Sequence, residues 1–283
     1  MTYSYYIGID VSKKSFDACL HHDKPKAQSF SNDAKGIKLF FKHFSKQIGN
    51  ALVVLESTGG YELLLLESLL KQKLAVHRVA PRVAHHYMRS LRLYAKTDAL
   101  DAHLLARYGA ERGDKLACFE LKDQGQRELK TWMMRRDDLV QMRTQEKNRL
   151  KNPYYADLKE DIMLHIEHLN QQIAAIEKQA RLCLKESPDL AQKAKIMQSI
   201  SGVGEQTAWV LLSYMPELGL LGRKQAASLA GCAPHPRESG TISRYRSTKG
   251  GRCRVKRALY MAAMAARNSK SHLAETCKKL KKE

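Results

Sequence analysis

The chain has 283 residues with 49 Lys and Arg against 29 Asp and Glu, which gives a formal net charge of +20 and a pI of about 9.7. This charge is typical of a protein that binds a polyanion, and nucleic acid is the first candidate. No apolar stretch of 18 residues, signal peptide or lipidation motif is present, and the six cysteines form no CxxC pair, so the sequence argues against a membrane protein, a zinc knuckle and a disulfide framework.

The first predicted strand covers residues 5–10 and ends in Asp10. Its apolar and aromatic residues indicate a buried strand, in which a terminal aspartate has no packing role. Residues 15–20 and 27–30 predict two more strands, and we expect the three to form a meander.

A helix is predicted next, with a start that either Asn32 or Asp33 can cap and an end at Gly49. Its apolar residues at helical spacing are Ile37, Phe40, Phe41 and Phe44.

The following strand, residues 52–56, ends in Glu56. A leucine-rich helix at 61–73 and a strand at 75–80 come after it. Strands that alternate with helices are typical of an α/β fold, in which ligands bind beyond the carboxyl ends of the strands. We therefore expect Asp10 and Glu56 to lie at a binding edge.

A second pair of acids, Asp98 and Asp101, would lie on one face if residues 96–101 open a helix. Together with Asp10 and Glu56, four carboxylates could then converge and hold Mg²⁺ or Mn²⁺ for phosphoryl transfer. The alternative is structural, with Asp10 in a turn, Glu56 on the surface and Asp98 as a helix cap. Two strand-end acids beside a paired acid on a helix favour the metal site.

Two long polar helices are predicted at residues 126–151 and 158–185, separated by Asn152-Pro153 because proline cannot continue a helix. The second helix has a narrow apolar seam formed by Ile162, Ile166, Leu169, Ile173 and Ile176. The two helices should form an antiparallel hairpin. A hairpin that packs on its own domain and one that serves as a dimerisation or nucleic-acid arm fit the pattern equally well.

After a boundary at residues 187–188, a Gly-x-Gly turn with Gly202 and Gly204 precedes a helix predicted at 206–214. Such a turn lets backbone N–H groups approach a phosphate oxygen. It resembles the turn of helix-hairpin-helix modules, which grip nucleic-acid backbones without reading sequence. A plain glycine turn is the alternative.

The densest positive charge lies between residues 237 and 257, where Glu238 is the single acid. The basic residues are Arg237, Arg244, Arg246, Lys249, Arg252, Arg254, Lys256 and Arg257. Because Ser, Thr, Gly and Tyr245 are interspersed, we predict a loop wrapped on phosphates, with a solvated basic surface as the alternative. A helix at 255–267 follows it.

Five segments, in this order, resemble the DEDD transposases of insertion-sequence family 110 and the related Piv/MooV DNA invertases. They are YIGIDVSK at 6–13, ESTGGY at 56–61, KTDALDA at 96–102, ISGVG at 200–204, and the stretch from Ala233-Pro234 to Glu238-Ser239-Gly240. Five motifs in order are far more specific than any one of them, and the resemblance spans nearly the entire chain.

The resemblance implies three domains. A RuvC-like, ribonuclease-H-type α/β domain would occupy residues 1–122, a helical-hairpin or coiled-coil insertion 123–186, and a mostly α-helical transposase domain 187–283. The family's four acids match Asp10, Glu56, Asp98 and Asp101.

The family's serine matches Ser239, which would be a nucleophile that forms a transient phosphoserine link to DNA. From the sequence alone a serine before a glycine is usually a turn residue, and Ser243 and Ser247 rank below it. A serine hydroxyl becomes nucleophilic when its proton is removed or a metal polarises its surroundings.

The resemblance also implies a structured guide RNA that pairs with target and donor DNA, and a homo-oligomer, dimer or tetramer, in which the acids of one subunit meet the serine of another. We expect a soluble cytoplasmic protein of a prokaryote, associated with the nucleoid and with no membrane partner. Relatives often continue beyond the last helix, so we expect far C-terminal contacts to be shortened or missing.

The resulting prediction is a site-specific DNA transposase or recombinase. The alternatives are a RuvC-type junction endonuclease, which uses water as nucleophile, and a non-catalytic basic DNA-binding protein, which would bind with strong salt dependence and cleave nothing.

Overall fold

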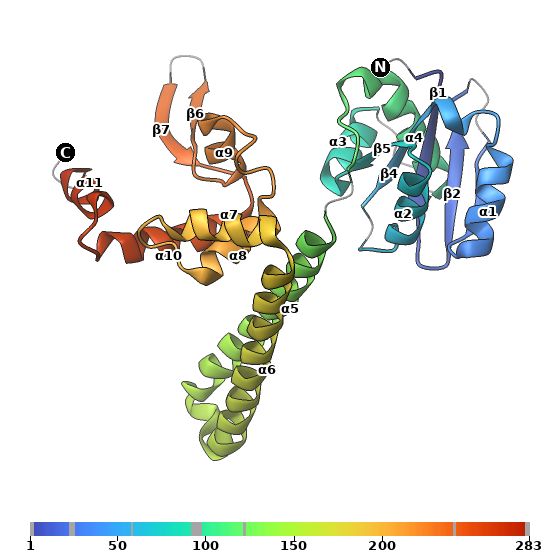
Figure 1. The fold of residues 1–283 in the computed structure, drawn as a ribbon. Coiled ribbons are helices and arrows are strands. Elements are labelled where there is room, and N and C mark those ends of the chain that lie inside the picture. Colours follow the sequence, from blue (N-terminus) through green and yellow to red (C-terminus); the bar gives the residue numbers. More distant parts are fainter. Residues whose placement is uncertain are drawn as a thin grey trace. The chain divides into compact units, whose positions relative to one another are not determined.

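The computed structural model describes residues 3–22, 26–57, 59–91, 98–120, 123–239 and 242–280, with the course of the backbone alone at 98–99, 237–239, 242–244, 277–278 and 280. The chain divides into two compact units, residues 1–121 and 122–283 (Figure 1). None of the described helices is long and apolar enough to cross a membrane.

The first unit is built on a five-stranded sheet with the order β3-β2-β1-β4-β5. Its strands are β1 (Tyr5–Val11), β2 (Ser15–Leu20), β3 (Gln28–Ser31), β4 (Ala51–Glu56) and β5 (Ala75–Val79). The first three strands form an antiparallel meander, whereas β4 runs parallel to both β1 and β5. The predicted meander and α/β fold are confirmed.

Helices cover both faces of this sheet (Figure 1). They are α1 (Ala34–His43), α2 (Leu63–Lys71), α3 (Pro81–Ser90) and α4 (Asp98–Arg112), with 3₁₀ helices at Ile48–Asn50 and Gly113–Lys115. The core on one face includes Ile7, Ile9 and Phe40, and the core on the other includes Val54 and Leu105. Because both faces are covered, β1 and β4 are nearly continuous apolar runs.

Asp33, rather than Asn32, caps α1. Its carboxylate accepts hydrogen bonds of 2.8 Å from the backbone N–H groups of Lys35 and Gly36. The bond from Gly36, followed by the bond from the Ser31 hydroxyl, holds the pKa of the Asp33 carboxyl below its usual value. α1 ends before the predicted stop at Gly49, which lies in a separate 3₁₀ helix.

The second unit begins with a helical hairpin of α5 (Gln124–Leu150) and α6 (Lys159–Glu186), joined by a 3₁₀ helix at Pro153–Leu158. Its buried seam contains Leu139, Leu169 and Ile173. An ion pair of 2.8 Å between Arg136 and Glu177 also joins the two helices. Both predicted helices and the break between them are confirmed.

Shorter helices complete this unit. They are α7 (Pro188–Gln198), α8 (Glu205–Tyr214), α9 (Arg223–Leu229), α10 (Cys253–Arg267) and α11 (His272–Leu280). Trp209 of α8 is fully buried in a cluster with Leu129 and Met133 of α5, which fixes α8 to the base of the hairpin. Leu211 of α8 shares a second cluster with Val255 of α10.

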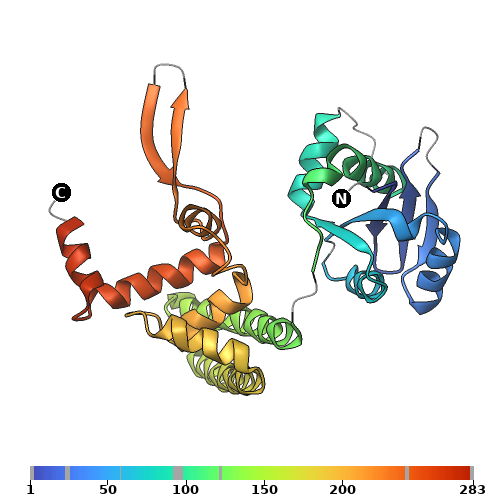
Figure 2. The same cartoon turned by 45° about the horizontal axis from the view of Figure 1, so that its top comes forward.

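The basic segment between residues 237 and 257 is not the loop that we predicted. It contains an antiparallel ribbon of β6 (Pro234–Ser239) and β7 (Ile242–Thr248), and α10 begins within it. The ribbon projects from the helices of its own unit (Figure 2). The prediction is wrong because basic residues alternate with Ile, Tyr and Thr, which favour strands, while the ribbon lacks the apolar face that identifies a buried strand in a sequence.

Candidate functional site

Asp10 and Glu56 are neighbours at the carboxyl edge of the sheet. Ile9 pairs with Leu55 in the parallel ladder between β1 and β4, and the two acids are the next residue on each strand. Adjacent strands are about 4.8 Å apart. Because successive residues alternate between faces, both acids lie on the face that carries Val54. Both are half-buried.

Helix α4 packs on this same face at very short range, with glycine at the contacts. A Cβ atom at Gly8 would lie 2.1 Å from the carbonyl oxygen of Ala102 and 2.2 Å from the backbone nitrogen of Ala106. Further along the helix, Gly109 approaches Tyr6, which precedes Gly8 on β1. α4 therefore runs antiparallel to β1.

This antiparallel course puts the first turn of α4 at the edge where β1 and β4 end. Asp98 is the first residue of the helix, and Asp101 is one turn further on, so the two share a helix face. The side chain of Asp101 is buried, with 9% exposure. The side chain of Asp98 lies outside the described residues. The backbone thus carries all four predicted acids to one edge of the unit, which we call the acid edge.

The donors at the acid edge fit a hard divalent cation, because all of them are carboxylate oxygens, the ligands that Mg²⁺ takes in proteins. Among the described residues, which leave out the Asp98 side chain, no three His, Cys, Asp or Glu side chains stand close enough together to hold a metal ion. A cation at this edge would therefore need Asp98 and substrate oxygens as further ligands. The metal site stays a prediction.

A fifth acid, which we did not identify from the sequence, lies beside Asp10. Asp17 of β2 pairs directly with Asp10 in the antiparallel ladder, so the two belong to the same face of the sheet. Like charges directly opposite each other are destabilising, and a bound cation would relieve their repulsion. The sequence feature that could have identified Asp17 is the short connection between the first two predicted strands. A tight turn at residues 12–15 places residue 16 opposite residue 11 and residue 17 opposite residue 10.

His103 of α4 stacks on His21, which follows β2 at the end of the sheet opposite to Asp10. Burial lowers the pKa of its imidazole, and the neighbouring His21 and Arg107 add to the shift. The rings of His103 and His21 stack with their centroids 6.4 Å apart. The Nδ1 atom of His103 is buried and has no hydrogen-bond partner among the described residues. We therefore expect a neutral ring at pH 7.

Ser239 is the last residue of β6, at the tip of the ribbon, and it pairs with Ile242 of β7. Arg237 pairs with Arg244, so by the two-residue period of a strand positions 237, 239 and 244 fall on one face. The side chains at 237–239 and 242–244 lie outside the described residues. The predicted nucleophile is thus on a basic ribbon of the second unit, and its role stays a prediction.

Two of the arginines that we predicted to bind nucleic acid have partners inside the second unit. Arg252 lies 2.6 Å from the Glu217 carboxylate and donates a hydrogen bond of 2.7 Å to the carbonyl oxygen of Tyr214. Arg254 lies 3.0 Å from the Asp137 carboxylate, with its guanidinium 4.9 Å from the centre of the Tyr214 ring. These contacts hold α10 against α8 and α5, which gives both arginines a structural role.

Most of the other described basic residues between 237 and 257 are more exposed to solvent than Arg252 and Arg254. Those that are exposed are Arg246, Lys249 and Arg257. Tyr245 is 93% exposed. Lys256 donates a hydrogen bond of 2.8 Å to the hydroxyl of Thr248 and so links α10 to β7. The exposed positive charge is concentrated on the ribbon and its junction with α10.

The two glycines of the Gly-x-Gly turn have different surroundings. Gly202 has a φ of +87°, and a Cβ atom there would lie 2.3 Å from the carbonyl oxygen of Ala262 in α10. Packing and backbone conformation therefore both require glycine. Gly204 is the N-cap of α8 with a φ of −84°, and a Cβ atom there would meet nothing within 4 Å. Gly204 alone leaves open space in front of the helix N-terminus.

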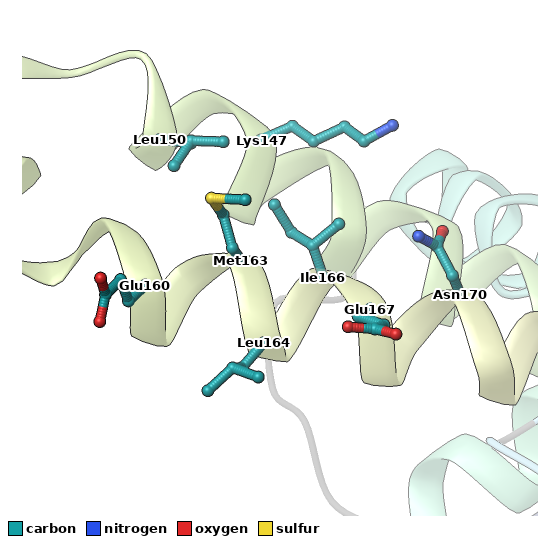
Figure 3. Close-up of a pocket in the computed structure, with 8 residues that line it drawn as sticks. All are labelled: Lys147, Leu150, Glu160, Met163, Leu164, Ile166, Glu167 and Asn170. Carbon is teal, nitrogen blue, oxygen red and sulfur yellow. The ribbon is translucent and has the colours of Figure 1, made fainter.

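An open groove lies near the tip of the α5–α6 hairpin (Figure 3). Its lining residues are Lys147, Leu150, Glu160, Met163, Leu164, Ile166, Glu167 and Asn170. Leu164 is 68% exposed and Met163 is 58% exposed. The groove therefore combines apolar surface with charges of both signs.

Comparison with known proteins identifies relatives for both units. Residues 7–153 match the family model of the transposases termed DEDD and IS110, and residues 194–278 match that of the transposase IS116/IS110/IS902 family. The pilin gene-inverting proteins of Moraxella lacunata and Moraxella bovis are each 28% identical over 268 residues, covering 92% of this chain and 82% of theirs.

Among solved structures, T. thermophilus RuvC in complex with a Holliday junction substrate aligns with 40% of this chain and 98% of its own. The two are 12% identical, with a TM-score of 0.29.

Proposed function

The chain belongs to the IS110 family of transposases, and we propose that it cleaves and rejoins DNA strands through a transient phosphoserine link, with a divalent cation at the acid edge and a structured RNA as guide. The observation that carries the proposal is the common edge reached by β1, β4 and the first turn of α4. This arrangement supports a shared role for Asp10, Glu56, Asp98 and Asp101, which come from the ends of these strands and the start of this helix.

The role of the first unit is to hold carboxylates in place before DNA arrives. Asp10 and Glu56 are fixed by the central strands, and Asp101 by a helix in direct backbone contact with Gly8. Preorganised groups need little rearrangement during the reaction. When bound, Mg²⁺ or Mn²⁺ would offset the charge that develops on the phosphate and ease the departure of the leaving oxygen.

Ser239 would open the strand by transesterification. Its Oγ atom forms a bond to phosphorus, the bond from phosphorus to a deoxyribose oxygen breaks, and the serine proton is transferred so that the leaving oxygen becomes a hydroxyl. For rejoining, a hydroxyl of the new strand attacks the phosphoserine and releases the serine. The number of phosphodiester bonds is conserved, so no external energy source is needed. Hydrolysis by water would lose that bond and leave a nick.

DNA would bind mainly to the C-terminal part of the second unit. Residues 187–283 contain 18 Lys and Arg against 6 Asp and Glu, whereas residues 122–186, which include the hairpin, contain 13 against 11. Affinity for DNA backbones comes largely from basic residues near phosphates. The ribbon that carries Ser239 lies in the strongly basic part, which would bring the serine to a phosphate.

We propose that the groove near the hairpin tip contacts a second copy of the chain. The low net charge of residues 122–186 argues against nucleic acid there. Lys147 and Glu160 line the same groove. In a two-fold symmetric interface, which uses the same surface on both copies, Lys147 of one copy can pair with Glu160 of the other and the reverse. The acids of one subunit would then act with the serine of another.

A Leu164→Glu variant tests this contact, because it puts a charge into the apolar part of the groove. We expect it to lower the mass measured by sedimentation at equilibrium, relative to the wild type. Leu39→Glu is the matched control, since Leu39 is 58% exposed in the first unit. An unchanged oligomer with Leu164→Glu would contradict the proposed interface.

The guide RNA is tested by sequencing the RNA that copurifies with the protein. One discrete structured species, encoded beside the coding sequence and needed for cleavage after ribonuclease treatment, is the expected result. Heterogeneous cellular RNA that can be removed without effect would contradict this part of the proposal.

The proposed activity is tested with a plasmid that carries the coding sequence and its native flanking DNA. We expect excised junctions, or inverted segments, to be detected by outward-facing amplification with the wild type and to be absent with Asp10→Asn. A pure DNA-binding protein would give no such product in either case. A junction nuclease would give nicked plasmid without rejoined junctions.

A further inference from the structure

Three loops meet where the acid edge is built. β1, β3 and β4 all end at this edge, because β3 is antiparallel to β2, β2 is antiparallel to β1, and β1 is parallel to β4. The loop after β1 begins two residues beyond Asp10, and the loop after β4 begins directly after Glu56. Asn32 is the first residue after β3.

The side chain of Asn32 joins the other two loops. Its Nδ2 atom donates one hydrogen bond of 3.0 Å to the carbonyl oxygen of Ser12 and another of 3.0 Å to the carbonyl oxygen of Tyr61. Its backbone N–H donates a third bond, of 2.9 Å, to the carbonyl oxygen of Lys14. Asn32 therefore contacts the segment after Asp10 and the segment after Glu56 at once.

These contacts explain why the residue is asparagine. Both side-chain partners are carbonyl oxygens, which only a group with two N–H bonds can satisfy. The Oδ1 atom is buried and accepts no hydrogen bond from the described residues. The contacts of the side-chain amide are therefore the two bonds that its Nδ2 atom donates. The side chain is not needed to cap α1, because Asp33 does that.

The loop after β4 is also held from its far end. Glu62 is fully buried, and its Oε2 atom accepts a hydrogen bond of 3.0 Å from the backbone N–H of Gly60. Its other carboxylate oxygen pairs with Arg78 of β5. Gly60 has a φ of +101°, which glycine adopts at no steric cost. Glu62 and Asn32 together hold Gly60 and Tyr61, at the far end of the segment that follows Glu56.

We propose that Asn32 is a positioning residue for the DNA strand-cleavage reaction, whose amide clips Ser12, after β1, to Tyr61, after β4, and so holds the backbone that follows Asp10 and Glu56. The inference rests on the proposed function, because a positioning role for Asn32 requires that the acid edge binds a divalent cation. Asn32 itself touches neither cation nor DNA. It acts through the two loops, as groups that orient metal ligands do.

Asn32→Asp is the sharpest test, because it keeps the shape of the side chain and places an acceptor against two carbonyl oxygens. Asn50→Asp is the matched control, since Asn50 is exposed at the amino end of β4 and the same charge is added. Asn32→Ser, which adds no charge and is too short to reach both carbonyls, replaces Asn32→Asp if that variant does not fold.

Two measurements need no catalysis. We expect Asn32→Asp to raise the Mn²⁺ concentration for half-saturation, followed by electron paramagnetic resonance, by roughly 10- to 100-fold. We also expect faster hydrogen exchange at residues 12–15 and 59–62 with unchanged far-ultraviolet circular dichroism. The Mg²⁺ dependence of strand cleavage should shift in parallel, whereas a merely less stable protein would lose activity equally at all Mg²⁺ concentrations.

The possible failures are distinguishable. Wild-type Mn²⁺ affinity in a folded Asn32→Asp or Asn32→Ser variant would contradict the clip while leaving the proposed function intact. A wild-type protein that neither binds Mn²⁺ nor cleaves DNA would contradict the proposed function, and with it any positioning role for Asn32.

Discussion

The acid edge and the serine ribbon hold their functional residues in opposite ways. Asp10 and Glu56 lie at the carboxyl ends of two central strands of a five-stranded sheet, under a helix that touches β1 through Gly8. Ser239 ends one strand of a two-stranded ribbon that projects from its neighbouring helices. A lone two-stranded ribbon is only marginally stable in water, whereas a sheet packed between helices is rigid.

This difference suggests how the reaction is controlled. The sheet and α4 hold the backbone of the acid edge in place, and we expect the ribbon to gain a fixed position only when nucleic acid or another subunit contacts it. A nucleophile that is held in place only in the full complex would not open strands at random sites. Substitutions in the two units should therefore separate the cation chemistry of the first unit from the DNA binding of the second.

The largest expected effect is on catalysis. We expect Asp10→Asn to slow strand cleavage by at least about 100-fold, since loss of a metal ligand should exceed the loss of an outer-shell partner. DNA affinity should stay unchanged, because the basic ribbon proposed to bind DNA lies in the second unit. Asp114→Asn, an exposed change in the same unit, is the control for a rate measurement on labelled DNA. Wild-type rates in Asp10→Asn would remove the acid edge from the mechanism.

The two turn glycines separate folding from binding within the second unit. We expect Gly202→Ala to lower the free energy of unfolding by about 1–3 kcal/mol, because its Cβ atom would overlap the backbone of α10. Gly204→Ala should cost less than about 1 kcal/mol, because its Cβ atom meets nothing. If the turn at Gly204 binds a DNA phosphate, Gly204→Ala should weaken DNA binding although it changes stability little. Urea unfolding and DNA titration check both outcomes, and equal stability of the two variants would refute the distinction.

Arg252 and Arg257 should separate stability from DNA binding in the same way, with smaller effects. Arg252→Ala loses a partly exposed ion pair and a bond to the Tyr214 carbonyl, so it should lower stability by about 1 kcal/mol. Arg257→Ala should leave the melting temperature unchanged and reduce the slope of log affinity against log salt by about 0.9, one phosphate contact. The reverse pattern would show that Arg252 reaches DNA and that Arg257 supports the fold.

The smallest effect concerns acid stability of the first unit. The pKa of the Asp33 carboxyl is lowered in the folded state, so its cap stabilises the unit fully above the unfolded value and less as the pH falls through the folded value. In the Asp33→Asn variant the new amide side chain still caps α1 but does not titrate. The melting temperature of the variant should therefore depend less on pH below pH 4 than that of the wild type. Identical profiles would contradict the role of the charge.

Much of the first unit could be predicted from the sequence, because its signals are local. Apolar runs that stop at Asp10 and Glu56 identify two strands and the edge where they end. The course of α4 was not predictable, since it depends on Gly8 meeting Ala102, two residues far apart in the chain. Asn32 was identified only as a possible helix cap, because its partners are backbone carbonyls that no sequence pattern reveals.

The second unit was predictable where proline and helical periodicity dominate, as at the break between α5 and α6. The β6–β7 ribbon was not predictable, because its many charged residues obscure the pattern of a strand. Arg252 and Arg254 also look like DNA contacts in the sequence, and only their carboxylate partners indicate a structural role.

The central claim is that a serine on the ribbon becomes covalently linked to DNA in a reaction that depends on the acid edge. The most direct measurement is mass spectrometry of the protein after a stopped reaction on a nicked substrate and nuclease digestion. We predict a nucleotide phosphate attached to Ser239 in the wild type, none in Ser239→Ala, and retention of the adduct in Ser243→Ala and Ser247→Ala. A modified residue other than Ser239, or cleaved DNA with no adduct on the wild-type protein, would contradict the account.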